Sequence, residues 1–173
     1  METNNKLEEL LKKFRQSGSV TPTLQNALNA RTLKTNAMKI KLDEGAYLPT
    51  RAHFDDAGLD IYAREMKVVP AKGSETFDTG VHIELPKGTV GMLKSKSGLN
   101  VKHGLTSEGV IDVGYVGSIC VKLYNHSEYP YTVCKGDKIS QLVIMPILTP
   151  TLEVVDSLEE TERGDNGFGS SGK

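Results

Sequence analysis

One segment combines a carboxylate, a phenol and three glycines: it reads GVIDVGYVG, from Gly109 to Gly117. Glycine lets a backbone approach a flat ligand closely, so that N–H and C=O groups can bind the edge of that ligand. Asp112 follows an apolar isoleucine and has the chemistry of a general base that takes a proton from water. A β-turn with a solvated aspartate is the alternative, and the segment taken alone favours it.

A second segment, KSKSGLN over residues 94–100, places two cations and two hydroxyls just ahead of a predicted short helix. Helix N-termini attract anions through free N–H groups and the helix dipole. Lys96 and Ser97 are therefore candidates for binding phosphate oxygens. Ser97 is also predicted to cap the helix, which Gly104 ends. An ordinary capped helix with exposed lysines explains these residues equally well.

Two polar side chains interrupt apolar runs: Asp60 in AGLDIYA and Gln141 in GDKISQLV. Burying either side chain is costly unless hydrogen bonds compensate for the lost contact with water. Both residues are candidates for a functional site, and stabilisation of the fold alone is the alternative.

The C-terminal segment ERGDNGFGSSGK, residues 162–173, sets Arg163 and Phe168 among four glycines. So many glycines predict a segment that does not hold one conformation by itself. Residues 167–173 match the beginning of a P-loop, GxxxxGK. No Ser or Thr and no helix follow, so a P-loop is not predicted.

The elements that must position these residues change character near residue 38. Residues 1–37 contain KLEELLKKF and TLQNALNARTL, whose helical spacing predicts two short helices in an N-terminal extension. From Met38 on, apolar and polar residues alternate in stretches such as MKIKL and SICVKLY, which predicts strands with Ile119, Val121 and Leu123 facing inward. Turns rich in Pro and Gly separate these stretches. ISQLVIMPIL is expected to be an almost continuously buried strand. An all-β sandwich or barrel with one short helix at SGLNVKHG is expected.

Composition limits the class of protein. The chain has 173 residues, 38% hydrophobic and 25% charged, which suits one soluble domain with an appendage. The net charge of −1 argues against broad nucleic-acid binding. Residues 1–37 carry six basic and three acidic side chains against 15 and 19 in the remainder, which supports an added segment. No membrane-spanning run and no signal peptide are present in the sequence, so no membrane association is expected.

The two cysteines, Cys120 and Cys134, form no CxxC motif, and the four histidines show no metal-ligand spacing. We expect reduced, buried thiols in a cytosol and no zinc site. The expected location is therefore cytoplasmic, or the host cytoplasm if a phage encodes the protein.

Taken together and in order, five stretches resemble the five motifs of the trimeric dUTP diphosphatases, the dUTPases: AGLDIYA, SKSGLN, GVIDVGYVG, GDKISQL and RGDNGFGSSG. The resemblance covers residues 38–173 and implies a jelly-roll-like β-fold with a short helix after the second motif. It implies a β-domain over residues 38–160 and a flexible arm over 161–173 that closes over the active site. Residues 1–37 lie outside it.

The resemblance also implies a homotrimer with active sites where subunits meet, and Mg²⁺-dependent hydrolysis of dUTP to dUMP and pyrophosphate. This reaction would remove dUTP from the nucleotide pool and supply dUMP for thymidylate synthesis. Asp112 would be the general base, and Asp60 would orient water bound to the metal. The implied substrate ligands are Lys96, Ser97, Gly98 and Gln141 for the triphosphate, Thr106, Gly109, Val110 and Ile111 for uracil, Tyr115 for deoxyribose, and Arg163, Phe168, Gly169 and Ser170 of the arm.

Three departures from the family pattern affect these assignments. Lys96 and Lys138 stand where the family usually has arginine, and an ammonium lacks the bidentate fork of a guanidinium, so looser phosphate geometry is expected. The loop before the third motif lacks the asparagine that many relatives place near uracil, and Thr106 is the candidate substitute.

Two alternatives differ in what they predict. A dCTP deaminase on the same fold would use a carboxylate such as Glu108 and would release ammonia from dCTP. A regulatory or interaction protein would use residues 1–37 as a contact for a protein partner, alone or as a second role. Deleting residues 1–37 and measuring both the trimer mass and turnover would show what this segment serves.

Overall fold

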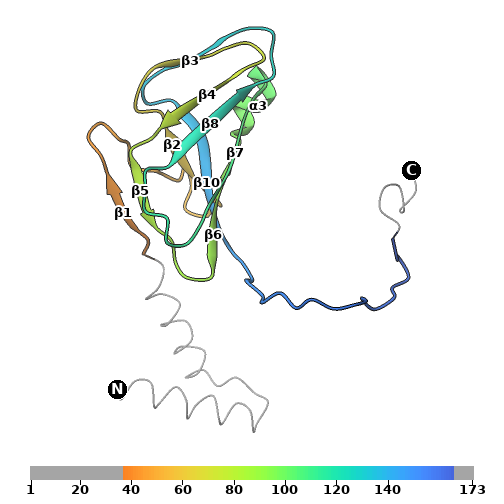
Figure 1. The fold of residues 1–173 in the computed structure, drawn as a ribbon. Helices are drawn as coiled ribbons and strands as arrows, with labels where there is room; N and C mark the ends of the chain where they lie inside the picture. The colour runs from red at the N-terminus through yellow and green to blue at the C-terminus, as the bar shows by residue number, and fades with distance from the viewer. Residues whose placement is uncertain (1–36, 166–173) are drawn as a thin grey trace, which may run out of the picture.

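The protein is described by a computed structural model over residues 37–165, which form a β-domain followed by an extended segment (Figure 1). The elements are β1 Lys39–Leu42, β2 Gly58–Tyr62, β3 Lys67–Val69, β4 Ser74–Asp78, β5 Val81–Glu84, β6 Thr89–Lys94, α3 Ser97–His103, β7 Leu105–Ile111, β8 Cys120–Asn125, β9 Tyr131–Val133 and β10 Lys138–Pro146. The helices expected in residues 1–37 fall, apart from Ala37, outside the described residues.

Six strands form the main sheet, in the order β2-β10-β6-β7-β8-β4, and two further pairs, β1-β5 and β3-β9, complete the domain. Every strand pair is antiparallel. Adjacent antiparallel strands need only short turns, which agrees with the many Pro- and Gly-containing turns in the sequence. The expected β class is thereby confirmed, and the architecture is consistent with a jelly-roll-like fold.

Alternation along the strands builds the core. In β8 every second residue is buried, so Val121 and Leu123 point inward together with the preceding Ile119, as expected. Phe77 of β4 and Leu142 of β10 are also fully buried in the same cluster. The core therefore lies between the main sheet and the strands folded over it.

The expected burial of ISQLVIMPIL is only half right. Ile139 and Leu142 are buried, whereas Met145 is 40% exposed and Leu148 is 93% exposed. The reason is strand pairing, because β10 pairs with β2 only up to Val143 and continues beside β6 alone. The end of β10 therefore lacks a neighbour on one side.

The thiols are free but not buried, so that expectation is wrong. Cys120 and Cys134 are both exposed. Cys120 begins β8 at an outward-facing position, because Val121 occupies the inward one.

Helix α3 begins differently from the prediction. Its N-cap residue is Lys96 and not Ser97, and no side chain caps the helix. The Lys96 side chain instead contacts Asp60. The predicted end is confirmed, because Gly104 adopts a left-handed conformation with φ of 65° and donates its N–H to the Asn100 carbonyl.

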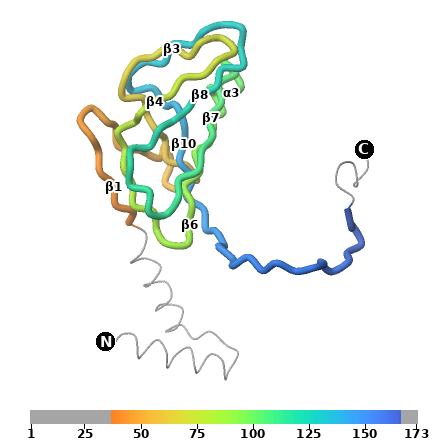
Figure 2. The backbone as a smooth tube through the Cα atoms, in the orientation of Figure 1, coloured from red at the N-terminus to blue at the C-terminus, as the bar shows by residue number. Residues whose placement is uncertain are grey.

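Beyond β10 the chain leaves the β-domain as an extended segment, drawn in blue in Figure 2. Residues 147–165 form no helix or strand. The segment carries apolar side chains that are almost fully exposed, among them Leu148, Leu152, Val154 and Leu158. No described helix is long and apolar enough to cross a bilayer.

Candidate functional site

A pocket of about 240 Å³ lies where β7 runs into the loop that follows it. We call it the hairpin pocket; it is lined by Leu93, Gly109, Val110, Ile111, Asp112, Tyr115, Ile119 and Cys120. Five predicted site residues, Gly109 to Asp112 and Tyr115, therefore meet in one place. The turn itself is as expected, because the Tyr115 N–H donates to the Asp112 carbonyl at 3.1 Å.

The glycines of this loop have a steric reason. A Cβ atom on Gly117 would lie 2.5 Å from the Tyr115 phenol oxygen, a distance that no side chain tolerates. Gly114 has φ of 96°, a conformation that favours glycine. The Tyr115 hydroxyl donates to the Ser118 carbonyl at 3.0 Å, so the phenol is folded back over its own loop. The loop thus presents a tyrosine ring beside the Asp112 carboxyl group.

The base of the loop is fixed to β4 and β5. The Ser118 hydroxyl donates to the Asp78 carboxylate, and the Gly80 N–H donates to the Ser118 Oγ at 2.9 Å. The Ile119 N–H donates to the Val81 carbonyl at 2.8 Å. The hydrogen bond from Ser118 holds the pKa of Asp78 below its usual range, so this anchor stays ionised.

A second group of charged residues surrounds Asp60 in β2, and we call it the cation cluster. Asp60 is nearly buried, with 9% of its side chain exposed. One carboxylate oxygen accepts a hydrogen bond from the Lys96 Nζ, and the other lies 2.7 Å from the Lys138 Nζ. Lys96 comes from the start of α3, Lys138 from the start of β10.

The pKa shifts of Asp60 and Lys138 both favour the charged forms of these two residues. Burial favours the neutral form of Asp60, but the hydrogen bonds from Lys138 and Lys96 outweigh burial and lower the pKa of Asp60. The hydrogen bond to Asp60 raises the pKa of Lys138. Two ammonium groups on one carboxylate leave one excess positive charge, which suits the binding of an anion.

Gln141 lies next to the cation cluster. It is the register partner of Asp60 in β2 and of Lys94 in β6. Its Nε2 donates to the Ser95 carbonyl at 3.1 Å. Gly58 makes room for it, because a Cβ there would lie 2.6 Å from the Gln141 Oε1. The sequence-based expectation that Asp60 and Gln141 are hydrogen-bonded is confirmed.

The remaining predicted residues lie elsewhere. Ser97 and Gly98 form the first turn of α3, directly after Lys96. The Thr106 hydroxyl is paired with the His126 Nε2 at 2.8 Å, and Thr106 does not line the hairpin pocket. Arg163 belongs to the extended C-terminal segment, and Phe168, Gly169 and Ser170 fall outside the described residues. In the single chain Thr106 therefore lies outside the hairpin pocket.

The hairpin pocket and the cation cluster are separate groups in one chain, because no residue of the cation cluster lines the hairpin pocket. The sequence did not indicate that Lys138 would hold Asp60, or that Leu93, Ile119 and Cys120 would line the pocket. The sequence feature that could have indicated Lys138 is its position three residues before Gln141 in the same motif.

The described residues offer limited ligands for a metal. No cluster of three or more His, Cys, Asp or Glu side chains that could hold an ion occurs within residues 37–165. Mg²⁺ commonly binds through one or two carboxylates, several waters and substrate phosphates, and needs no all-protein cage. Asp60, which lies beside two ammonium groups, supplies one carboxylate of the kind that this mode of binding needs.

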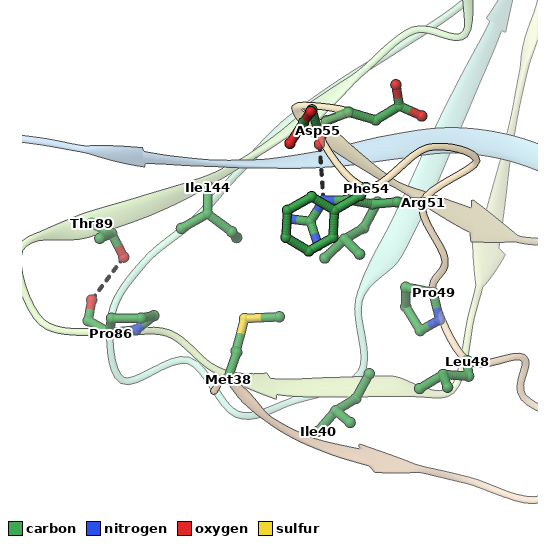
Figure 3. Close-up of a pocket in the computed structure, with 12 residues that line it drawn as sticks. Met38, Ile40, Leu48, Pro49, Arg51, Phe54, Asp55, Pro86, Thr89 and Ile144 are labelled. Atoms are coloured by element: carbon green, nitrogen blue, oxygen red, sulfur yellow. Dashed lines mark hydrogen bonds between the residues drawn. The ribbon is translucent and has the colours of Figure 1, made fainter. Parts of the chain in front are cut away.

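A different pocket, of about 720 Å³, lies between β1, the loop that precedes β2 and the end of β10 (Figure 3). Met38, Ile40 and Ile144 point into it, and Phe54 and Arg51 also line it. None of the predicted site residues lines it. Its mostly apolar lining does not suit a triphosphate.

Comparison with known proteins agrees with the five motifs. A family model described as dUTPase matches residues 44–172. The deoxyuridine 5′-triphosphate nucleotidohydrolase of Kluyveromyces lactis is 42% identical, over 80% of this chain and 96% of that protein. The same-named enzyme of Clostridium tetani is 44% identical, over 79% of this chain and 97% of that protein.

Solved structures give the same answer. The dUTPase of Staphylococcus bacteriophage 80alpha, solved with dUPNHPP, aligns with a TM-score of 0.76 and 36% identity, over 80% of this chain and all of that one. A mutant dUTPase from phage phi11 of S. aureus, whose structure describes the coordination of a structural Mg(II) ion, aligns with a TM-score of 0.68 and 32% identity, over 72% of this chain and all of that one. This chain belongs to the dUTPase family.

Proposed function

We infer that the protein hydrolyses dUTP to dUMP and pyrophosphate, and so removes dUTP from the nucleotide pool and supplies dUMP. The observation that carries this inference is the hairpin pocket, in which the Asp112 carboxyl group, the Tyr115 ring and the glycine-bearing end of β7 meet. The sequence matches to dUTPases support it over most of the chain.

Asp112 is our candidate for the general base. It would take a proton from a water molecule that attacks the α-phosphorus. A P–O bond then forms to the water oxygen, and the bond between the α-phosphorus and the bridging oxygen breaks. Pyrophosphate leaves with that oxygen and its electron pair, and Asp112 retains the proton until solvent accepts it.

The hairpin pocket would select the nucleoside. Backbone groups of Gly109, Val110 and Ile111 would pair with the edge of uracil, which a cytosine amino group would mismatch. The Tyr115 ring would lie against deoxyribose and leave no room for a 2′-hydroxyl. Because Gly109 lies 3.1 Å from Leu93 at its Cβ position, any side chain there would disturb this wall of the pocket.

The cation cluster would hold the triphosphate, with Lys96 and Lys138 as charges and Ser97, Gly98 and Gln141 as further donors. We propose Mg²⁺ as the cofactor, with Asp60 orienting water in its hydration shell. When bound, the ion would neutralise charge on the phosphate oxygens. Lys96 and Lys138 would bind these oxygens as point charges and not in the bidentate geometry of arginine.

We propose that residues 161–173 form an arm that closes over an occupied site. Arg163 would bind the γ-phosphate, Phe168 would cover uracil, and Gly169 and Ser170 would donate hydrogen bonds. Closure of such a segment excludes water and completes the set of charges around the substrate.

We propose that the active unit is a homotrimer. Two observations support assembly: the hairpin pocket and the cation cluster are separate in one chain, and the segment after β10 exposes Leu148, Leu152, Val154 and Leu158. Exposed apolar surface of this extent is typical of a protein–protein contact. A neighbouring chain would bury it and would supply the missing half of each site.

Deamination of dCTP is not favoured. Glu108, the carboxylate that this alternative needs, pairs with the Lys94 Nζ at 3.0 Å and is 76% exposed at its side chain. It does not line the hairpin pocket.

Purified protein with Mg²⁺ should release pyrophosphate from dUTP with a kcat/KM at least about a hundredfold above that for dCTP, dTTP or UTP, because a site built to pair with uracil leaves polar groups unpaired with other bases. A coupled pyrophosphate assay across the four nucleotides measures this. Ammonia release from dCTP, or equal turnover of all four nucleotides, would contradict the inference.

Asp112→Asn should lower kcat by about 10²–10⁴-fold, since an amide cannot accept the proton, while the Kd for a non-hydrolysable dUTP analogue changes by less than about threefold. Single-turnover kinetics and calorimetry separate the two quantities. Glu108→Gln, in β7 just before this loop, is the matched control and should leave kcat unchanged. Full activity of the Asp112→Asn variant would remove the base assignment.

Lys138→Ala should raise the KM for dUTP by about tenfold, because one charge-assisted contact to phosphate is lost, with a smaller effect on kcat. The effect should diminish at high salt, where charges are screened. Lys135→Ala in the same turn is the control and should leave KM unchanged. Equal KM values for the two variants would exclude Lys138 from the triphosphate site.

Light scattering should give a particle of three times the chain mass of 18.8 kDa. Val154→Glu provides a sharper test, because Val154 is 98% exposed in the single chain and its replacement would be harmless to a monomer. In a trimer that buries this side chain, the variant should lower the Tm by about 4 °C or more. A monomeric mass would refute the proposed assembly.

A further inference from the structure

One histidine outside both groups contacts the loop that carries Asp112. His82 lies in β5, and its side chain is 18% exposed. Its Nδ1 lies 2.8 Å from the Val116 carbonyl, in the loop between Asp112 and Ser118. Its Nε2 lies 3.0 Å from the Asp43 carboxylate, in the turn after β1. The ring therefore bridges the loop and this turn.

Within residues 37–165, no other hydrogen bond joins residues 113–117 of the loop to the rest of the domain. Ser118 and Ile119 anchor the C-terminal end of the loop, and β7 anchors its N-terminal end at Ile111. The other hydrogen bonds of residues 113–117, from the Tyr115 N–H and hydroxyl, stay inside residues 112–118. His82 thus provides the hydrogen bond between the tip of the loop and the rest of the domain.

From this geometry we propose that His82 is a positioning residue for Asp112 and Tyr115, and that the bridge needs the imidazolium form. The proposal rests on the proposed function, since positioning matters only if Asp112 acts as the base. The need for the imidazolium form follows from the two partners of the ring, because a carbonyl and a carboxylate both accept hydrogen bonds. A neutral imidazole has one N–H to donate, whereas an imidazolium has two.

The surroundings of the ring favour the charged form. The hydrogen bond to Asp43 and then that to Val116 raise the pKa of His82 above its ordinary value of 6.5. The hydrogen bond from His82 in turn lowers the pKa of Asp43. Lys41, the register partner of His82, also pairs with Asp43 and opposes protonation of the ring. Arg64 and Asp78, which form an ion pair with each other, also lie nearby, because Arg64 and Asp43 both flank the position of a Cβ on Gly80.

The direction of the pH effect follows from the sign of the shift. A raised pKa means that the bridge is fully formed below pH 6.5 and is lost as the pH rises through the folded-state pKa of His82. Above that pH the single remaining proton serves either Asp43 or Val116. Turnover should therefore decline on the alkaline side, with little change in the binding of the triphosphate.

The first test compares two replacements of His82. His82→Ala removes both hydrogen bonds and should lower kcat by about tenfold, since a small displacement of a reacting group is costly, while KM changes less. His82→Asn keeps a donor near the position of Nδ1 and cannot titrate. It should recover most of the lost kcat and should show no decline at alkaline pH. Thermal unfolding of both variants reports whether they fold.

The second test leaves His82 in place, so it remains valid if the first variants do not fold. In Asp43→Asn the amide can donate to Nε2, which leaves the imidazole proton for Val116, so the alkaline decline in kcat should disappear. Glu84→Gln is the matched control: Glu84 lies on the same strand and pairs with Lys39, not with His82. The imidazole pKa, measured by NMR, should coincide with the midpoint of the decline in the wild-type protein.

The results of these tests separate the positioning role of His82 from the proposed hydrolysis of dUTP. Wild-type kcat and an unchanged pH profile in both His82 variants, or an identical profile in Asp43→Asn, would overturn the positioning role. These results would leave the proposed function intact, because wild-type pyrophosphate release at pH 6 measures that function separately. Absence of release at every pH would refute the proposed function itself.

Discussion

The placement of the hairpin pocket and of the cation cluster depends on the pairing of β6 with its two neighbours. On one side β10 pairs with β6 and brings Gln141 beside Lys94, at the point where the chain turns into Lys96 and α3. On the other side β7 pairs with β6 and sets Gly109 against Leu93. Side chains alternate across a sheet, so a slip of one residue in either register would turn the functional side chains away from their partners.

Burial of the Asp60 carboxylate is unfavourable unless cations compensate for its charge. Asp60 is almost completely buried and keeps its ionised form only because Lys96 and Lys138 both donate to it. The same contacts hold two flexible lysine side chains at one place before any substrate binds. In the proposed triphosphate site, cations held in place in this way would lose less conformational entropy on binding, which would offset part of what an ammonium group lacks relative to guanidinium.

The hairpin combines freedom and restraint in one loop. Gly114 adopts a backbone conformation that other residues rarely adopt, and the Tyr115 ring occupies the space that a side chain on Gly117 would need. The restraint comes from outside the loop, through Ser118 at its base and His82 at its tip. The proposed role of Asp112 as a base would depend on such anchors, because a glycine-bearing loop does not by itself specify one conformation.

Local sequence determined several features correctly because each depends on one residue or one short period. Gly104 ends α3 since only a left-handed residue continues the chain there, and Ile119, Val121 and Leu123 point inward since strand side chains alternate. Asp60 and Gln141 stood out because a polar group in an apolar strand needs a partner. The order of the five motifs was enough to indicate the family.

Tertiary structure alone decided what depends on contacts between distant segments. Ser97 fails to cap α3, and the Lys96 that precedes it reaches Asp60, 36 residues earlier in the chain. His82 lies in none of the five sequence motifs, yet strand pairing places it between Asp43 and Val116. The sequence by itself determined which residues could do chemistry, through their types and order. Only the fold decided which of them meet, because strand register and side-chain pairing join residues that no local spacing relates.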